Sequence, residues 1–318
     1  MKPSWLGWLW LACLCFTTSC QPTRCCLEPS IGFCPPKKLI ETLPNPFPKL
    51  TAAERAQDWG KELYVGKAFA KEMDFYRAIT CFKKALFLIP RKAAERRLEI
   101  EYDIFLAYYA AGKYQDAVET YEGSRLIDAT EDFPASRNLL ITLYDAYKQN
   151  DQPERACRIL EVLVNTECQT AQRLILSSAI LEADFPEIVE TSDESPEAES
   201  VCQMLSTYSS ESKSVTKARL LNAVLPGAGY WYVGQKKSAL TSFLINALFI
   251  AATYQLFDRG YIPAGIITAS LETGWYFGGI NGAGIEANQF NQCLYDRLGR
   301  ETMVQERLFP ILMLDYGF

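Results

Sequence analysis

The chain has 318 residues, of which 49% are hydrophobic and 22% are charged, with a formal net charge of -6 and no histidine. The absence of histidine excludes a Ser-His-Asp triad, a Cys-His pair and any His-ligated metal site. The negative charge, with no basic stripe to neutralise phosphates, argues against nucleic acid as a partner. We therefore expect no catalytic residues, no metal and no cofactor, in a chain long enough for two structural regions.

Residues 1–20 have the pattern of an export signal, with Lys2 as the charged start and an apolar run from Trp5 to Phe16. That run is too short to span a bilayer, which needs ~20 residues. The end of the signal, from Thr17 to Cys20, resembles a bacterial lipoprotein cleavage site, although threonine stands at Thr17 where a leucine is usual. The resemblance implies that Cys20 is acylated. Ordinary signal cleavage and an uncleaved anchor remain open.

Residues 21–50 contain seven prolines. This composition predicts an extended, polyproline-like tether rather than a packed element. Cys25, Cys26 and Cys34 lie in the tether. After export, disulfide bonds are more natural for them than a metal site, and the pairing stays open.

Residues 51–190 predict a domain of helical pairs. Thr51 and Glu54 have the spacing of a capping box, and the apolar periodicity predicts helices over 52–71, 74–89, 92–111, 114–127, 134–149, 153–165 and 169–182. A small residue at Ala78 lets two helices approach closely, and Phe82 fills the space beside it. The same phase returns at two later alanines, so that the anchors are Ala78, Ala117 and Ala156, each step being 39 residues.

This pattern resembles a tetratricopeptide repeat (TPR). The residues that carry the resemblance are Gly66, Phe69, Phe75, Ala78, Phe82, Ala85 and Pro90 in the first copy, Tyr108, Gly112, Tyr114, Ala117 and Tyr121 in the second, and Tyr147, Pro153, Ala156 and Leu160 in the third. The step exceeds the family's usual ~34 residues. The resemblance implies about three antiparallel helix pairs with a groove for a protein or peptide partner. An ordinary helical bundle with coincidental spacing is the alternative.

The stretch 191–214 is acidic and polar and is predicted to be a linker. The sequence changes character at Val215, where a membrane domain over 215–290 is expected. Tyr230, Trp231 and Tyr232 suit a membrane interface. Residues 238–257 carry no charge and are long enough to cross the hydrocarbon layer. Residues 261–283 form a second apolar run that is broken only by Glu272.

The block from Leu225-Pro-Gly-Ala-Gly to Asn288 resembles a group of small bacterial membrane domains that carry an L-P-G-x-G-x-x-Y-x-G entry before two spans. The resemblance implies a transmembrane helical hairpin, with residues 291–318 as a tail that ends in an apolar stretch. A buried hairpin of a soluble domain is the alternative. The export signal and the positive-inside tendency give opposite orientations, so the orientation stays open.

Two features of the hairpin predict contacts. Small residues recur every four positions at Ser270, Gly274, Gly278 and Gly282, which is the pattern of a closely packed helix face in lipid. Glu272 is the only ionisable residue in either predicted span, and Asn246 lies at a similar depth on the facing helix. We hypothesise that a hydrogen bond between these two side chains fixes the register of the hairpin. A proton or ion pathway through Glu272 is the alternative.

The sequence as a whole therefore predicts an all-α protein, with a TPR-like array followed by a transmembrane hairpin. The expected function is a membrane-attached, non-catalytic scaffold for protein–protein interaction, with its array in the periplasm. Envelope assembly is the expected setting. An oligomeric transport or channel component, with Glu272 in the pathway, is the alternative function.

Overall fold

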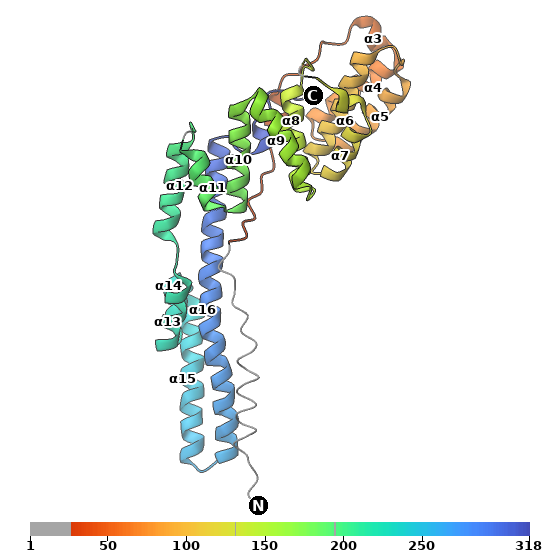
Figure 1. Ribbon diagram of the computed structural model, residues 1–318. Coiled ribbons are helices and arrows are strands. Elements are labelled where there is room, and N and C mark those ends of the chain that lie inside the picture. Colours follow the sequence, from red (N-terminus) through yellow and green to blue (C-terminus); the bar gives the residue numbers. More distant parts are fainter. Residues whose placement is uncertain (1–26, 131, 194) are drawn as a thin grey trace, which may run out of the picture. The chain divides into compact units, whose positions relative to one another are not determined.

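The computed structural model describes residues 27–130, 132–193 and 195–318. These residues form helices and turns, without a strand, so the all-α class is confirmed for them (Figure 1). Cys20, the signal, Cys25 and Cys26 lie outside the described residues. Cys34 is described and carries a free thiol.

The chain divides into two compact units. The array unit comprises residues 29–211 and 294–318, and the long-helix unit comprises residues 212–293 with residues 27–28. The helices of the array unit are α2 (Lys37–Thr42), α3 (Ala52–Ala56), α4 (Asp58–Lys71), α5 (Phe75–Leu88), α6 (Ala94–Ala110), α7 (Tyr114–Glu122), η1 (Arg125–Asp128), α8 (Ser136–Gln149), α9 (Pro153–Thr166), α10 (Cys168–Glu182), α11 (Phe185–Ser192), α12 (Ala198–Glu211) and η2 (Pro310–Leu312). The long-helix unit holds α13 (Val215–Val224), α14 (Ala228–Val233), α15 (Lys236–Asp258) and the first part of α16 (Ile262–Gln305).

The array unit contains four helix pairs, α4–α5, α6–α7, α8–α9 and α10–α11, each packed on the next (Figure 1). The turn within every pair has the same geometry. One residue has a positive φ, and the next residue donates a backbone hydrogen bond to the carbonyl five positions earlier, which is a Schellman-type helix end. The turn residues are Met73, Gly112, Asp151 and Ala183, and the accepting carbonyls are those of Phe69, Tyr108, Tyr147 and Ala179.

The small residues of the repeated pattern lie where helices meet. Ala78, Ala117 and Ala156 are at most 1% exposed. A Cβ placed on Gly66 would come within 2.6 Å of the Phe82 ring. Small size at these positions is therefore a packing requirement. Of the other residues in the pattern, Phe75, Phe82, Ala85 and Tyr147 are buried, Phe69, Tyr108, Tyr114 and Tyr121 are half-buried, and Pro90, which follows the buried Ile89, is exposed.

Two predictions about this region are wrong. The described array has a fourth helix pair, α10–α11, in place of about three. It escaped detection because Ile188 occupies the position of the anchor alanines and because Ala183 follows Asp151 by 32 residues instead of 39. The predicted linker over 191–214 contains helix α12, on which Val201 and Met204 are buried. Two apolar side chains at helical spacing sufficed to pack a segment whose composition is polar.

The predicted tether is also a packed element from Pro29 onward. The side chain of Ile40 in α2 is 3% exposed. Phe47 lies with its ring centroid 5.8 Å from that of Tyr102 and 5.6 Å from that of Phe133. The prolines set an extended backbone, and the apolar residues between them bury themselves on the array, which offsets the entropy of ordering the chain.

The glycines of the Leu225-Pro-Gly-Ala-Gly motif bring the helices of the long-helix unit together. Gly227 has a φ of +93°, and a Cβ there would lie 2.3 Å from the carbonyl oxygen of Ala239 on α15. A Cβ on Gly229 would lie 2.2 Å from the carbonyl oxygen of Ala218 on α13 and 2.8 Å from the Cβ of Ala283 on α16. The motif is therefore a junction at which α14 touches three other helices.

Helix α15 is the one helix among the described residues that is long and apolar enough to cross a membrane. The mean hydropathy of its most apolar window is 1.5, and only 11% of that window is buried, so α15 is not the core helix of its unit. The second predicted span, 261–283, lies almost entirely in α16. It does not reach the mean hydropathy expected of a membrane-spanning helix, because Glu272 and the glycines lower its hydropathy.

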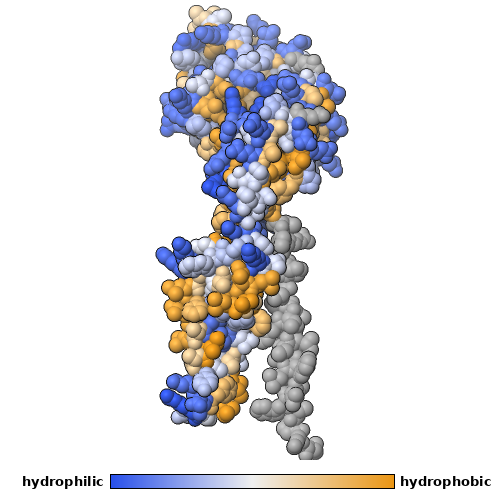
Figure 2. Space-filling model, turned by 90° about the vertical axis from the view of Figure 1, so that its left-hand side faces the viewer, coloured by the Kyte–Doolittle hydropathy of each residue, from blue (hydrophilic) through white to orange (hydrophobic). Residues whose placement is uncertain are grey.

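Large apolar side chains remain exposed along both long helices. They include Leu240, Phe243, Leu244, Leu248, Ile250 and Tyr254 on α15 and Ile266, Ile267, Leu271, Trp275 and Phe277 on α16. Figure 2 shows apolar side chains gathered over this unit. An exposed apolar surface of this extent marks a membrane or partner contact.

The predicted small face of α16 is not packed on α15. A Cβ on Gly274 or on Gly278 would meet nothing within 4 Å. Gly282 of the same face does lie close to α14, since a Cβ there would come within 2.2 Å of the Tyr230 hydroxyl. The contact with α13 and α15 is at Gly279, where a Cβ would lie 3.3 Å from Asn222 and 3.7 Å from Ser242. One residue further along a helix is 100° further around it, so the residue that faces α15 is not on the small face, which is open at Gly274 and Gly278 and contacts α14 at Gly282.

The glycine junction gives a matched pair of substitutions. Gly229→Ala should destabilise the protein by about 1–3 kcal/mol, because the new methyl group would strike a backbone oxygen that cannot move aside. Gly274→Ala should leave stability unchanged or raise it by up to about 1 kcal/mol, because the site is open and alanine favours a helix. Thermal unfolding of both variants in one detergent checks this, and equal melting temperatures would contradict the junction.

Candidate functional site

The end of the chain lies along the helix pairs of the array unit. This terminal segment, residues 306–318, leaves α16 and returns to the array, and Figure 1 marks its end beside α8. The carbonyl oxygen of Glu306 accepts a hydrogen bond from Arg173 of α10 at 2.6 Å. Nearly all its apolar side chains are buried, namely those of Leu308, Phe309, Pro310, Leu312, Met313, Leu314 and Phe318. The array thus already holds an irregular peptide segment.

Helix α8 contacts the main chain of the terminal segment. The side chain of Asn138, which is fully buried, accepts a hydrogen bond from the backbone N–H of Asp315 at 3.2 Å. It also donates one to the carbonyl oxygen of Tyr316 at 2.9 Å. Arg137 donates to the carbonyl oxygen of Met313 at 3.0 Å and pairs with the carboxylate of Asp315. Both ends of the Asn138 amide are therefore used to recognise peptide backbone.

The final residue fills an aromatic site. The ring centroid of Phe318 lies 6.3 Å from those of Phe75 and Phe82, and its ring stacks on Phe82. The preceding Gly317 donates its N–H to the carbonyl oxygen of Pro44 at 2.9 Å, and a Cβ on it would lie 2.9 Å from Leu43. The terminal segment is therefore held between the array and the proline-rich segment, residues 29–50.

A cavity lies beside the terminal segment. A cavity of about 490 Å³ is lined by residues 29–35, by the α6–α7 turn and by residues 309–311 of the terminal segment. Asp145 of α8 borders it and accepts a hydrogen bond from the hydroxyl of Tyr109 at 2.7 Å. Burial raises the pKa of Asp145. A second cavity of about 200 Å³ shares Asp145 and Pro310, so the terminal segment is bordered by space on two sides.

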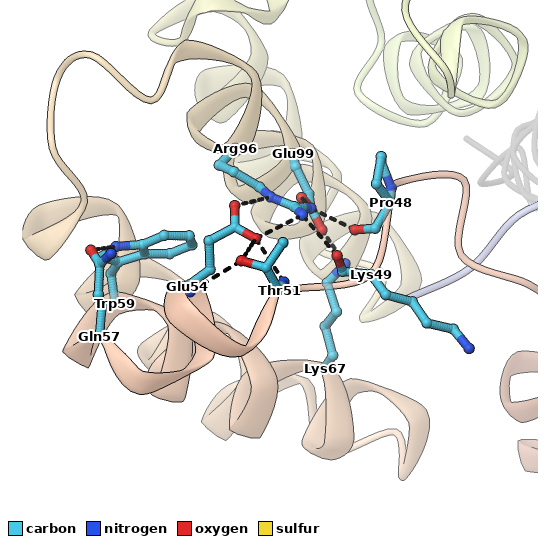
Figure 3. Close-up of polar contacts among 9 residues, drawn as sticks. All are labelled: Pro48, Lys49, Thr51, Glu54, Gln57, Trp59, Lys67, Arg96 and Glu99. Atoms are coloured by element: carbon cyan, nitrogen blue, oxygen red, sulfur yellow. Dashed lines mark hydrogen bonds and ion pairs between the residues drawn. The ribbon is translucent and has the colours of Figure 1, made fainter.

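A cluster of charges fixes the proline-rich segment to α6 (Figure 3). The Arg96 guanidinium donates to the carbonyl oxygens of Pro48 and Lys49 and pairs with the carboxylates of Glu54 and Glu99. The predicted capping box of Thr51 and Glu54 is confirmed. Since Glu54 serves both the box and Arg96, the start of α3 is tied to α6 through one carboxylate.

Lys67 extends the same cluster inward. Its ammonium lies 2.5 Å from Glu99 and 3.4 Å from Asp103, whose side chain is fully buried. Burial raises the pKa of Asp103 to about 7, a shift that Lys67 opposes and Glu99 reinforces. The hydrogen bond from Arg96 lowers the pKa of Glu54 to about 2. Each carboxylate faces a cation across a helix contact, and the arrangement joins helices.

The predicted pair in the long helices is not formed. The amide of Asn246 donates to the carbonyl oxygen of Ser242 at 2.6 Å, within its own helix. The Asn246 Oδ1 atom and both carboxyl oxygens of Glu272 are buried without a hydrogen-bond partner among the described residues. The hydroxyl oxygens Ser242 Oγ and Thr253 Oγ1 are likewise buried without a hydrogen-bond partner among the described residues. Similar depth along two facing helices did not suffice, because each side chain also needs the right position around its helix.

Comparison of the chain with models of known protein families, with curated proteins and with solved structures found no match. Among the residues that the structure describes, no group of three or more Cys, Asp or Glu side chains is placed to hold a metal ion.

Sequence reasoning missed Arg137, Asn138 and the terminal segment as parts of one site. The apolar stretch at the end of the chain was visible, but nothing in it indicates the surface that it covers. Asn138 offers a weak signal, since it is a polar residue on the buried side of α8, between Leu139 and Ala135. Its partner lies about 177 residues away in the chain, and a contact at that distance has no local pattern.

The buried carboxyl group predicts a pH dependence. Because the pKa of Asp103 is raised in the folded state, that state keeps a proton that the unfolded chain releases, and stability should fall as pH rises from about 4 to 7. Asp103→Asn should remove that slope, by up to about 1.4 kcal/mol per pH unit. Chemical unfolding across pH 4–8 measures it, with Asp116→Asn on the exposed side of α7 as the control. Parallel curves for wild type and Asp103→Asn would contradict this role.

Proposed function

We propose that the protein is a membrane-attached, non-catalytic scaffold for protein–protein interaction, with its TPR-like array as the binding part. The observation that carries the proposal is the docked terminal segment, because the surface under it has the chemistry of peptide recognition. Asn138 and Arg137 bind main-chain groups, which every peptide offers, and the Phe75–Phe82 site selects an aromatic side chain. A partner segment with an apolar, aromatic end fits the same surface.

The terminal segment then competes with a partner. It is tethered to the array, so its effective concentration at the surface is high, on the order of millimolar for a flexible connection. A partner peptide binds when its binding free energy at this surface exceeds that of the terminal segment, or when the terminal segment is released. The array of a bacterial envelope protein would in this way stay closed until its partner is present.

Membrane attachment rests on three features. Helix α15 is long and apolar enough to cross a bilayer and is little buried. The exposed apolar side chains continue onto α16, which supports a two-span hairpin although the second segment is less hydropathic. The Cys20 motif supplies a lipid anchor that would place the array in the periplasm. Envelope assembly is the setting in which such a scaffold acts.

The peptide site can be tested in the full-length protein in detergent. Phe318→Ala should loosen the terminal segment, so that a labelled peptide with the sequence of residues 308–318 binds this variant and not the wild type. Adding Asn138→Ala should abolish the binding. Tyr76→Ala, which removes an aromatic ring that is 84% exposed on α5, is the control and should change nothing. Fluorescence anisotropy gives the affinities. A folded Phe318→Ala variant that does not bind the peptide would refute the site.

An oligomeric transport or channel component is the second candidate. It is favoured by four residues of α15 and α16 whose buried polar atoms have no partner in the part of the chain that the structure describes, namely Ser242, Asn246, Thr253 and Glu272. Polar groups at membrane depth need partners, and a neighbouring copy or a permeating ion would supply them. In that case the open face at Gly274 and Gly278 is the contact between copies.

A further inference from the structure

A groove of about 630 Å³ runs between α15 and α16 inside the long-helix unit. One wall consists of Ser238, Thr241 and Ser242 of α15, and the other of Gly274, Trp275, Gly278 and Gly279 of α16. Tyr230 of α14, Lys237 and Glu286 also line it. Lys237 lies at the start of α15 and Glu286 is separated from Gly274 by three helical turns, so the charged residues mark one end of the groove and the glycines the other.

The glycine end is apolar and empty. A Cβ on Gly274 or Gly278 would meet nothing within 4 Å, so neither α15 nor any other described segment fills the space above these residues. Trp275 flanks it with a side chain that is 49% exposed. The floor is a strip of bare helix backbone beside an aromatic ring, which suits an unbranched hydrocarbon chain.

The opposite end carries two charges of opposite sign. Lys237 and Glu286 both line the groove, yet neither forms an ion pair with the other or with any further residue that the structure describes. Each remains available for a ligand. A ligand that satisfies both must carry an anionic and a cationic group.

A buried hydroxyl lies between the two ends. Ser242 is 7% exposed, and its Oγ atom has no hydrogen-bond partner among the described residues. Five residues separate it from Lys237, which corresponds to about 7.5 Å along the helix axis. The order along the groove is thus a pair of opposite charges, a free hydroxyl and an apolar strip.

We propose that this groove binds one phospholipid with a zwitterionic head group that ends in a primary ammonium. Lys237 receives the phosphate, Glu286 receives the ammonium, Ser242 donates to an ester oxygen, and an acyl chain lies over Gly274 and Gly278. The order of these groups in the lipid is the order of their partners in the groove. The inference rests on the proposed membrane attachment and adds a specific lipid to it.

The test uses the full-length protein in a mild detergent and counts lipid adducts by native mass spectrometry. Phosphatidylethanolamine should give one retained adduct, at least fivefold more abundant than the adduct with phosphatidylglycerol, which lacks the ammonium. Gly278→Leu should lower the phosphatidylethanolamine adduct at least tenfold, because the side chain fills the strip. Glu286→Ala should abolish the preference between the two lipids, and Lys237→Ala should weaken binding of both.

Two substitutions serve as matched controls. Lys236→Ala removes the neighbouring lysine, and Ala264→Leu places the same leucine side chain at an exposed position of α16. Neither residue lines the groove. Both should leave the adducts unchanged.

Three results would overturn the proposal. An adduct that survives Gly278→Leu would place the lipid elsewhere, and equal binding of the two lipids by the wild type would remove the head-group assignment. Efficient disulfide cross-linking between copies carrying Gly278→Cys would show that a second copy occupies the groove. Flotation with phosphatidylglycerol vesicles separates these failures from failure of membrane attachment. Wild-type protein that floats but forms no adduct refutes only the lipid site, and protein that does not float refutes the attachment.

Discussion

The burial of the terminal segment on the helix pairs is the contact on which the array unit depends. Residues 308–318 place seven apolar side chains against the array, each of them buried. Burying a large apolar side chain contributes about 1.5–3 kcal/mol. Asn138 adds the specificity, because an amide with no exposed surface must find hydrogen-bond partners and finds them in the backbone of Asp315 and Tyr316. The apolar contacts hold the segment and the amide sets its register.

The same contact joins the terminal segment to the proline-rich segment. Gly317 bonds to Pro44 in the proline-rich segment, and that segment is fixed to α6 by Arg96. The array is therefore covered by two irregular segments that meet each other. Arg96, which holds the proline-rich segment, is paired with Glu99, and Glu99 is paired in turn with Lys67 across the contact between α4 and α6. Under the proposed function, a partner would have to displace one of these two segments.

The helices of the long-helix unit are held together in a different way. Its helices meet at Gly227 and Gly229, where backbone touches backbone, and its outward surface is apolar. Beyond this junction the packing among the described residues is incomplete, since Gly274 and Gly278 face open space and several buried polar atoms have no partner there. In water such an arrangement would be costly. Surrounded by lipid, with a head group at Lys237 and Glu286, the same features become a binding site.

The sequence by itself determined the local structure, because helix formation depends on neighbours in the chain. The periodicity around Ala78, Ala117 and Ala156, the capping box at Thr51 and the apolar run of α15 all predicted the elements that are present. It did not reveal the fourth pair, whose turn at Ala183 is equivalent to the others while Ile188 replaces the small residue. It also treated the proline-rich and acidic segments as linkers, because their composition is polar or extended and only contact with the array shows that they pack. The tertiary structure alone decided that Asn138 meets Tyr316, that Glu272 does not bond to Asn246, and that the small face of α16 is open at Gly274 and Gly278. These outcomes depend on how helices are rotated and on which distant segments meet, and a one-dimensional pattern contains neither quantity.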